Sequence, residues 1–175
     1  IMVAEGKLID RLAGASLVEP FRDILGSLAK TAFAQGFVLA VDSLTKRELP
    51  DERIFRTIGE YLRALDAVEE IPGRTRSMLF DAAVLKLLDT LGFGIELDAC
   101  IGCRGDVSMP GAMMSLHRGG IECPSCCSPA SLTVARDTVE TLRRFRSSPL
   151  AEAASGTGPE HVHREICFLT DLRLG

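Results

Sequence analysis

Two short stretches decide the fold of this chain, Cys-Ile-Gly-Cys at residues 100–103 and Cys-Pro-Ser-Cys at residues 123–126. Nineteen residues separate them. A C-x2-C turn brings two thiolates to one edge of a zinc tetrahedron, and two such turns supply four ligands at Zn–S distances of about 2.3 Å. Buried free thiols or an adventitious disulfide are the alternative interpretation. The pattern predicts one structural Zn²⁺ ion, held by Cys100, Cys103, Cys123 and Cys126.

Four cysteine ligands leave no coordination position open for water, which argues against catalysis by this metal. The chain contains six cysteines in all. Cys127 directly follows Cys126, but the i,i+3 spacing from Cys123 favours Cys126 as the ligand, so we interpret Cys127 as a bystander. Cys167 has apolar neighbours and is typical of a buried core thiol.

The segments on both sides of the cysteine-rich stretch have helical periodicity. Residues 74–91 are apolar on nearly every face, which is typical of a helix at the centre of a bundle, and Gly92 is expected to end it. Other helices are predicted from an N-cap at Ser16 to Leu44, with a kink or split at Gly26 and Gly36, from Pro50 to before Pro72, from Ser131 onward, as a short turn over 150–154, and from Pro159 onward.

These patterns predict a mainly α fold, a helical bundle interrupted once by an inserted four-cysteine, zinc-ribbon-like finger. The bundle is expected to comprise residues 16–97 and 128–175, and the zinc-binding insert residues 98–127. Residues 7–12 favour a strand, with a turn at Gly14. Residues 1–15 are expected to be a remnant of a preceding domain or a linker, because the chain resembles a piece of a longer protein.

The composition limits the classes of function. Aromatic residues make up 5% of the 175 residues and the net charge is −4, which argues against an all-β fold and against a basic surface covering the whole molecule. The sequence has no run of eighteen apolar residues and no secretory signal, so we expect no membrane association and a reducing, cytoplasmic location. Motifs for nucleophilic, zinc-protease or phosphate-loop chemistry are missing, and we therefore predict that the chain is not an enzyme.

Basic side chains are the candidates for contacts with DNA or with an acidic partner. Two lie at the start of the central helix, one in the cysteine-rich stretch and three at the end of the helix that follows it. A solvated helix end is the simpler interpretation of each one taken singly. The six candidates are Arg74, Arg76, Arg118, Arg143, Arg144 and Arg146.

Several motifs follow one another in a distinctive order along the chain. They are LVEPF at 17–21, LGFGIELDAC at 91–100, SLHRGGIECPSC at 115–126, RFR at 144–146 with PL at 149–150, and HRE at 163–165. This order resembles the carboxy-terminal part of the bacterial RecO family of recombination mediators. The similarity extends over roughly residues 7–172 and is most specific over 91–126.

The resemblance implies a DNA-repair protein of the bacterial cytoplasm and nucleoid. Members of the family bind single- and double-stranded DNA and anneal complementary strands. They engage single-stranded-DNA-binding protein through its acidic tail, and they act with RecR to load the RecA recombinase. The family also has an amino-terminal OB-fold, of which residues 1–15 would be the last remnant.

Two other hypotheses stay open at this point. The chain could be a zinc-stabilised adaptor that contacts only proteins, without direct DNA binding. A metal-dependent or thiol-based enzyme is the third hypothesis, and it requires a metal site with a ligand other than cysteine.

Overall fold

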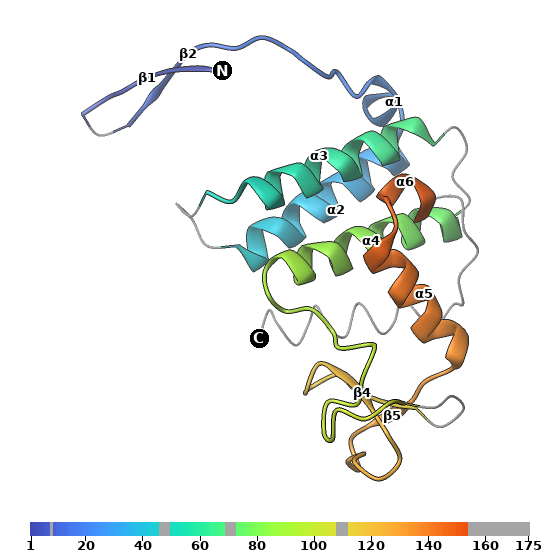
Figure 1. The fold of residues 1–175 in the computed structure, drawn as a ribbon. Helices are drawn as coiled ribbons and strands as arrows, with labels where there is room; N and C mark the ends of the chain where they lie inside the picture. The colour runs from blue at the N-terminus through green and yellow to red at the C-terminus, as the bar shows by residue number, and fades with distance from the viewer. Residues whose placement is uncertain (8, 46–49, 69–72, 108–111, 154–175) are drawn as a thin grey trace.

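The computed structural model describes residues 1–7, 9–45, 50–68, 73–107 and 112–153, with side chains described at all of these except 73–77. Within these ranges the fold is mainly α with one small cysteine finger, as the sequence predicts (Figure 1). The elements in chain order are β1 Met2–Ala4, β2 Arg11–Gly14, α1 Arg22–Leu25, α2 Leu28–Leu44, α3 Glu52–Ala67, α4 Gly73–Thr90, β3 Met113–Ser115, β4 Gly120–Glu122, β5 Leu132–Thr133, α5 Arg136–Ser147 and α6 Leu150–Ala153.

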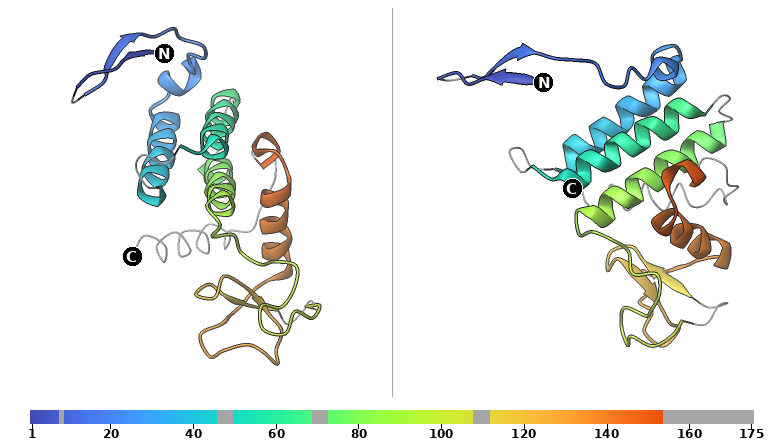
Figure 2. Two further views of the ribbon diagram at one scale, coloured as in Figure 1. Left: turned by 60° about the vertical axis from the view of Figure 1, so that its left-hand side comes forward. Right: turned by 45° about the horizontal axis from the view of Figure 1, so that its top comes forward.

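Helix α4 is the centre of the bundle, which confirms the prediction for 74–91. The consecutive side chains of Ala82, Ala83, Val84 and Leu85 are all buried, so burial extends around the helix. Helices α2, α3, α5 and α6 all pack against α4, and Figure 2 shows α4 between the other helices. The helix ends before Gly92, whose φ of 83° lies in the left-handed region that favours glycine.

Aromatic rings fill the space between α2, α3 and α4. The ring centroids of Phe37 and Tyr61 lie 4.3 Å apart, and Phe80 meets both rings edge to face. The Tyr61 hydroxyl donates a hydrogen bond to the carbonyl oxygen of Phe33 at 3.2 Å. Burial, with a smaller contribution from the charge of Asp81, raises the pKa of Tyr61, so this hydroxyl acts as a neutral donor inside the core.

The helix predicted from Ser16 begins later than expected, and its N-cap is wrong. Helix α1 starts at Arg22, after Phe21, whose φ of 44° and ψ of 55° place it in the left-handed region. The predicted split at Gly26 is confirmed, because α2 begins anew with Ser27 as its cap. Gly36 lies inside α2 without interrupting it. The residues 16–20, which the sequence predicted as the first turns of this helix, are not helical.

An antiparallel hairpin of β1 and β2 occupies the amino-terminal end and stands apart from the bundle in Figure 1 and in the right-hand view of Figure 2. The Gly6 N–H donates to the Asp10 carboxylate at 3.1 Å and closes the turn between the strands. The strand predicted over 7–12 is therefore wrong in position, because Asp10 stabilises a turn there. The second strand starts at Arg11 and includes Gly14, where the sequence predicted a turn.

The finger is built on a three-stranded antiparallel sheet in the order β4-β3-β5. Met114 pairs with Ile121 of β4 and with Leu132 of β5. The helix predicted from Ser131 is therefore wrong at its start, since Leu132 and Thr133 pair as a strand and α5 begins at Arg136.

The short turn predicted over 150–154 is confirmed by α6. The helix predicted from Pro159 and the core position of Cys167 lie outside the described residues. Among the helices of the described ranges, none combines the length and the apolar composition that crossing a membrane requires.

Candidate metal centre

The two cysteine turns bring four sulfur atoms together in the finger. The Sγ atoms of Cys100, Cys103, Cys123 and Cys126 all lie within 4.8 Å of one another. A tetrahedral ion with Zn–S bonds of about 2.3 Å needs sulfur atoms about 3.8 Å apart. The Sγ atoms of Cys103 and Cys123 are 3.9 Å apart. Four cysteines, predicted to converge by their spacing alone, are thus close enough to hold one metal ion.

Backbone contacts fix the first turn, which contains Cys100 and Cys103. The Arg104 N–H donates to the Cys100 carbonyl oxygen at 2.8 Å, and the Cys100 N–H donates to the Gly105 carbonyl oxygen at 3.0 Å. Arg104 adopts a φ of 61°, a left-handed conformation unusual for a residue with a side chain. Gly102 approaches the second turn so closely that a Cβ atom there would lie 2.8 Å from Cys126 Cβ. Only glycine fits this position without movement.

Hydrogen bonds within the cluster shift the pKa values of two of the thiols, Cys100 and Cys126, in opposite directions. The Cys123 N–H points at Cys100 Sγ from 3.3 Å, and the N–H of Cys103, together with this donor, lowers the pKa of Cys100 to about 6. Hydrogen bonds with the Cys123 and Cys103 sulfurs raise the pKa of Cys126 to about 12. Because a metal binds thiolates, its binding would displace the protons that remain on the cluster.

Cys127 lies outside this group of four sulfurs. Its thiol is exposed and donates a hydrogen bond to the Pro124 carbonyl oxygen at 3.2 Å. The second turn therefore directs Cys126 into the cluster and Cys127 away from it.

A buried carboxylate supports the finger on the side of β4, and the sequence analysis missed it. Glu122 is 0% exposed, and it accepts hydrogen bonds from the Arg118 guanidinium and from the Ser131 hydroxyl. Ser131 in turn shares a hydrogen bond with Ser128 at 3.0 Å. A charge buried this deeply requires such partners. No local pattern marks Glu122, because a glutamate next to a cysteine is usually exposed.

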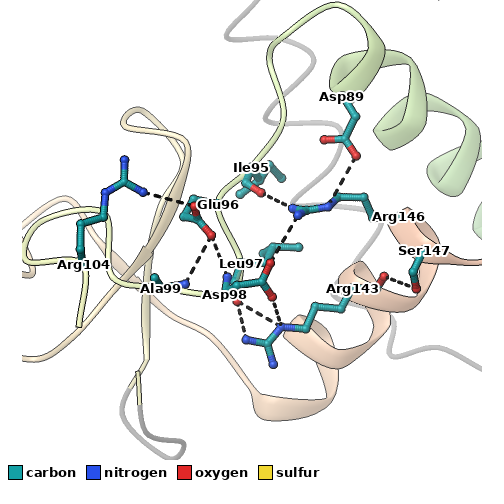
Figure 3. A network of polar contacts seen from close by, with 10 residues as sticks. All are labelled: Asp89, Ile95, Glu96, Leu97, Asp98, Ala99, Arg104, Arg143, Arg146 and Ser147. Atoms are coloured by element: carbon teal, nitrogen blue, oxygen red, sulfur yellow. Dashed lines mark hydrogen bonds and ion pairs between the residues drawn. The ribbon is translucent and has the colours of Figure 1, made fainter. Parts of the chain in front are cut away.

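The segment that enters the finger is held by α5 (Figure 3). Arg143 Nε donates to the Leu97 carbonyl oxygen at 3.1 Å, and one terminal nitrogen of Arg146 donates to the Ile95 carbonyl oxygen at 2.7 Å. Both guanidinium groups also contact the Asp98 carboxylate, at 3.3 and 3.4 Å. Arg146 reaches Asp89 at the end of α4 as well, at 3.8 Å. Burial raises the pKa of Asp89, and Arg146 opposes that effect.

The structure therefore does not gather the described candidate arginines into one free patch. Arg143 and Arg146 join α5 to the entering segment, while Arg118 pairs with Glu122 inside the finger. Arg144 is exposed, and no ion pair with a described residue engages its guanidinium. Arg74 and Arg76 lie in the first turns of α4, but their side chains are outside the described part of the chain.

Fold and site together define a helical domain that carries a finger with four cysteines close enough to hold a metal ion. The family model described as "Recombination protein O C terminal" matches residues 25–174. The chain belongs to the RecO family, which confirms the resemblance of its motifs.

Relatives support this assignment. "DNA repair protein RecO" of Rubrobacter xylanophilus is 34% identical over 169 residues, covering 94% of this chain and 66% of the relative. The protein of the same description from Symbiobacterium thermophilum is 30% identical, covering 85% of this chain and 58% of the relative. That from an Anaeromyxobacter species is also 30% identical, with coverages of 82% and 56%. The chain thus spans between about half and two thirds of the length of these relatives, and no solved structure matches it.

Proposed function

We propose that this chain is part of a mediator of DNA repair and homologous recombination. The observation that carries the proposal is the family match over residues 25–174, which includes all four clustered cysteines. By that kinship it would bind DNA, single-stranded and in some contexts double-stranded. It would also engage single-stranded-DNA-binding protein and RecR, and so promote strand annealing and recombinase loading in the nucleoid of a bacterial cytoplasm.

The metal proposed for the finger is one structural Zn²⁺ ion. Four sulfur ligands favour zinc over harder cations such as Mg²⁺ or Ca²⁺, which take oxygen ligands. When bound, the ion would cross-link the two turns. It would take no part in a reaction, because four cysteine ligands leave no coordination position for water or a substrate. Metal analysis of purified protein is expected to give one zinc per chain, and Cys123→Ser is expected to reduce that ratio.

The proposed work of the protein is positional and electrostatic, and no bond is made or broken. Exposed basic side chains would contact DNA phosphates or an acidic peptide tail. Arg144 is the best placed of the described candidates, because Arg118, Arg143 and Arg146 have partners within the fold. We predict that the chain is not an enzyme. The proposed contacts of Arg74 and Arg76 with DNA or a partner also stay predictions.

A protein-only adaptor is the second candidate function. The engagement of three arginines inside the fold favours it, as does the net charge of −4. In that case the finger and bundle would serve partner proteins, and DNA contact would come from elsewhere in the assembly. The proposed domain limits, with 1–15 as the remnant of an OB-fold, are compatible with either function.

Fluorescence anisotropy with labelled oligonucleotides separates the two functions. The chain is titrated against single- and double-stranded DNA at low and raised salt. A mediator that contacts phosphates is expected to bind at low salt, with an affinity that falls steeply as salt rises. Arg144→Ala should weaken that binding and Arg118→Ala should change it little. Absence of binding at every salt concentration contradicts direct DNA contact and supports the adaptor.

A further inference from the structure

The segment 95–98, between α4 and the finger, presents two different faces. Glu96 forms an isolated parallel β-bridge with Gly120, so the carbonyl groups before and after it point away from that bridge. Glu96 donates its N–H to the Gly119 carbonyl oxygen and accepts from the Ile121 N–H, both at 2.9 Å. The carbonyl oxygens of Ile95 and Leu97 point to the other side, where α5 lies (Figure 3). The segment thus bridges the finger and the bundle.

We infer that Arg143 and Arg146 are positioning residues that fix the orientation of the metal-binding finger on the helical bundle. Together with Asp98 and the carbonyl oxygens of Ile95 and Leu97 they form an arginine clasp. The two arginines stand three positions apart on α5, about one helical turn, and therefore project from the same face. Their guanidinium groups meet carbonyl oxygens two positions apart in the extended segment. One helix face thereby holds one face of a strand-like segment.

The clasp uses properties that only arginine offers. Each guanidinium group contacts a carbonyl oxygen and the Asp98 carboxylate at once, which a planar group with several N–H donors can do. Arg146 adds a third contact with Asp89 and so includes the end of α4 in the same arrangement. The Arg143 and Arg146 side chains are 42% and 35% exposed and Asp98 is 65% exposed, so the contacts with the carbonyl oxygens are partly buried while the carboxylate meets water.

Metal binding and orientation are separate properties in this arrangement. The four sulfurs cross-link residues 100–126 to one another, whereas the clasp acts on the segment that precedes Cys100. Removing the clasp should therefore free the finger to rotate as a unit while the sulfur cluster stays intact. Any effect on DNA or partner binding rests on the proposed function, but the orientation itself does not.

The test compares variants of the zinc-loaded 175-residue chain by NMR, using residual dipolar couplings of backbone amides. In the parent, couplings from α4 and from β3 and β4 are expected to fit one alignment tensor. In Arg143→Ala/Arg146→Ala they should require two tensors, with the zinc content still one per chain. Arg144→Ala, on the same helix and with the same kind of charge removed, is the matched control and should keep one tensor. In Arg143→Lys/Arg146→Lys, which keeps the charges, the dipolar couplings should fit one tensor better than in the double alanine variant but less well than in the parent.

Two results would overturn the inference. One is a single tensor in the double alanine variant, which means that other contacts orient the finger. The other is a loss of zinc in parallel with the loss of alignment, which means that the arginines stabilise the sulfur cluster. Should the double variant not fold, Asp98→Asn tests the inference instead, because the exposed Asp98 side chain tolerates the change. Faster motion of the finger amides in NMR relaxation supports the clasp. Unchanged relaxation contradicts it. None of these measurements includes DNA or a partner, so a failed mediator function leaves them unaffected.

Discussion

Gly102→Ala is the sharpest test of the metal centre, because the structure fixes what the added methyl group would meet. The new Cβ atom would lie 2.8 Å from Cys126 Cβ and 3.0 Å from Cys126 Sγ. Carbon atoms pack favourably at about 3.5 Å or more, so the two turns must separate by roughly 0.7 Å. Overpacking of this kind costs about 1–3 kcal/mol. If the cost falls on the metal-bound form, zinc binding weakens roughly 5- to 150-fold.

Gly105→Ala is the matched control for this substitution. Its Cβ atom would lie 3.5 Å from Cys103 Sγ, an ordinary contact in the same turn. Zinc affinity is measured under reducing conditions by competition with a chelator of known affinity, and circular dichroism confirms that the helices of the bundle are retained. Equal affinity of Gly102→Ala and the parent would refute the reasoning. Equal loss in Gly102→Ala and Gly105→Ala would show that any side chain in this turn disturbs the site, whatever its contacts.

Three further outcomes are expected. Arg104→Gly should raise the melting temperature of the zinc-loaded protein, because a left-handed backbone costs a residue with a side chain about 1–2 kcal/mol, more than the exposed ion pair with Glu96 contributes. Arg104→Ala should lower the melting temperature, since it loses the ion pair and keeps the strained backbone. The reverse order of the two variants contradicts the argument. Glu122→Gln should cost about 1–3 kcal/mol in urea denaturation, since charge-assisted hydrogen bonds from Arg118 and Ser131 are lost in a buried site; an unchanged midpoint would show that the carboxylate adds nothing over an amide. Hydrogen bonds from Arg53 lower the pKa of Asp51, the N-cap of α3, to about 2, so its contribution to stability is complete above about pH 4 and is lost as the pH falls through about 2. Thermal melts between about pH 5 and pH 2 should therefore show a steeper decline in the parent than in Asp51→Asn, which keeps a capping side chain that does not titrate.

The convergence of the four cysteines could be predicted from the sequence because its geometry is local. Each C-x2-C turn fixes the separation of its own two sulfurs through contacts within a few residues, such as that of Arg104 N–H with the Cys100 carbonyl oxygen. The central helix could be predicted for a similar reason, because apolar residues on nearly every face of 74–91 are typical of a buried helix. Both inferences depend on residues close to one another in the chain.

The roles of the arginines could not be predicted because their partners are distant in sequence. Arg143 meets a carbonyl oxygen 46 positions away, and Arg146 meets one 51 positions away. A carbonyl group has no signature in the sequence, since every residue carries one. Arginines near the end of an amphipathic helix therefore resemble a solvated or DNA-binding cluster until the fold places backbone oxygens opposite them.

The two errors at helix starts arose from the same sequence signal. Ser16 and Ser131 both precede apolar residues at helical spacing, and serine is a favourable N-cap. At Ser131 the hydroxyl instead donates to the buried Glu122 at 2.5 Å, and the following residues pair with β3. A buried charge needs that donor more than a helix needs one cap, because an unsatisfied ionised group costs more than a missing capping bond. Because Glu122 needs the Ser131 hydroxyl as a hydrogen-bond donor, residues 131–133 stay in the finger and α5 begins only at Arg136. The start of α5 in turn determines which face of the helix carries Arg143 and Arg146.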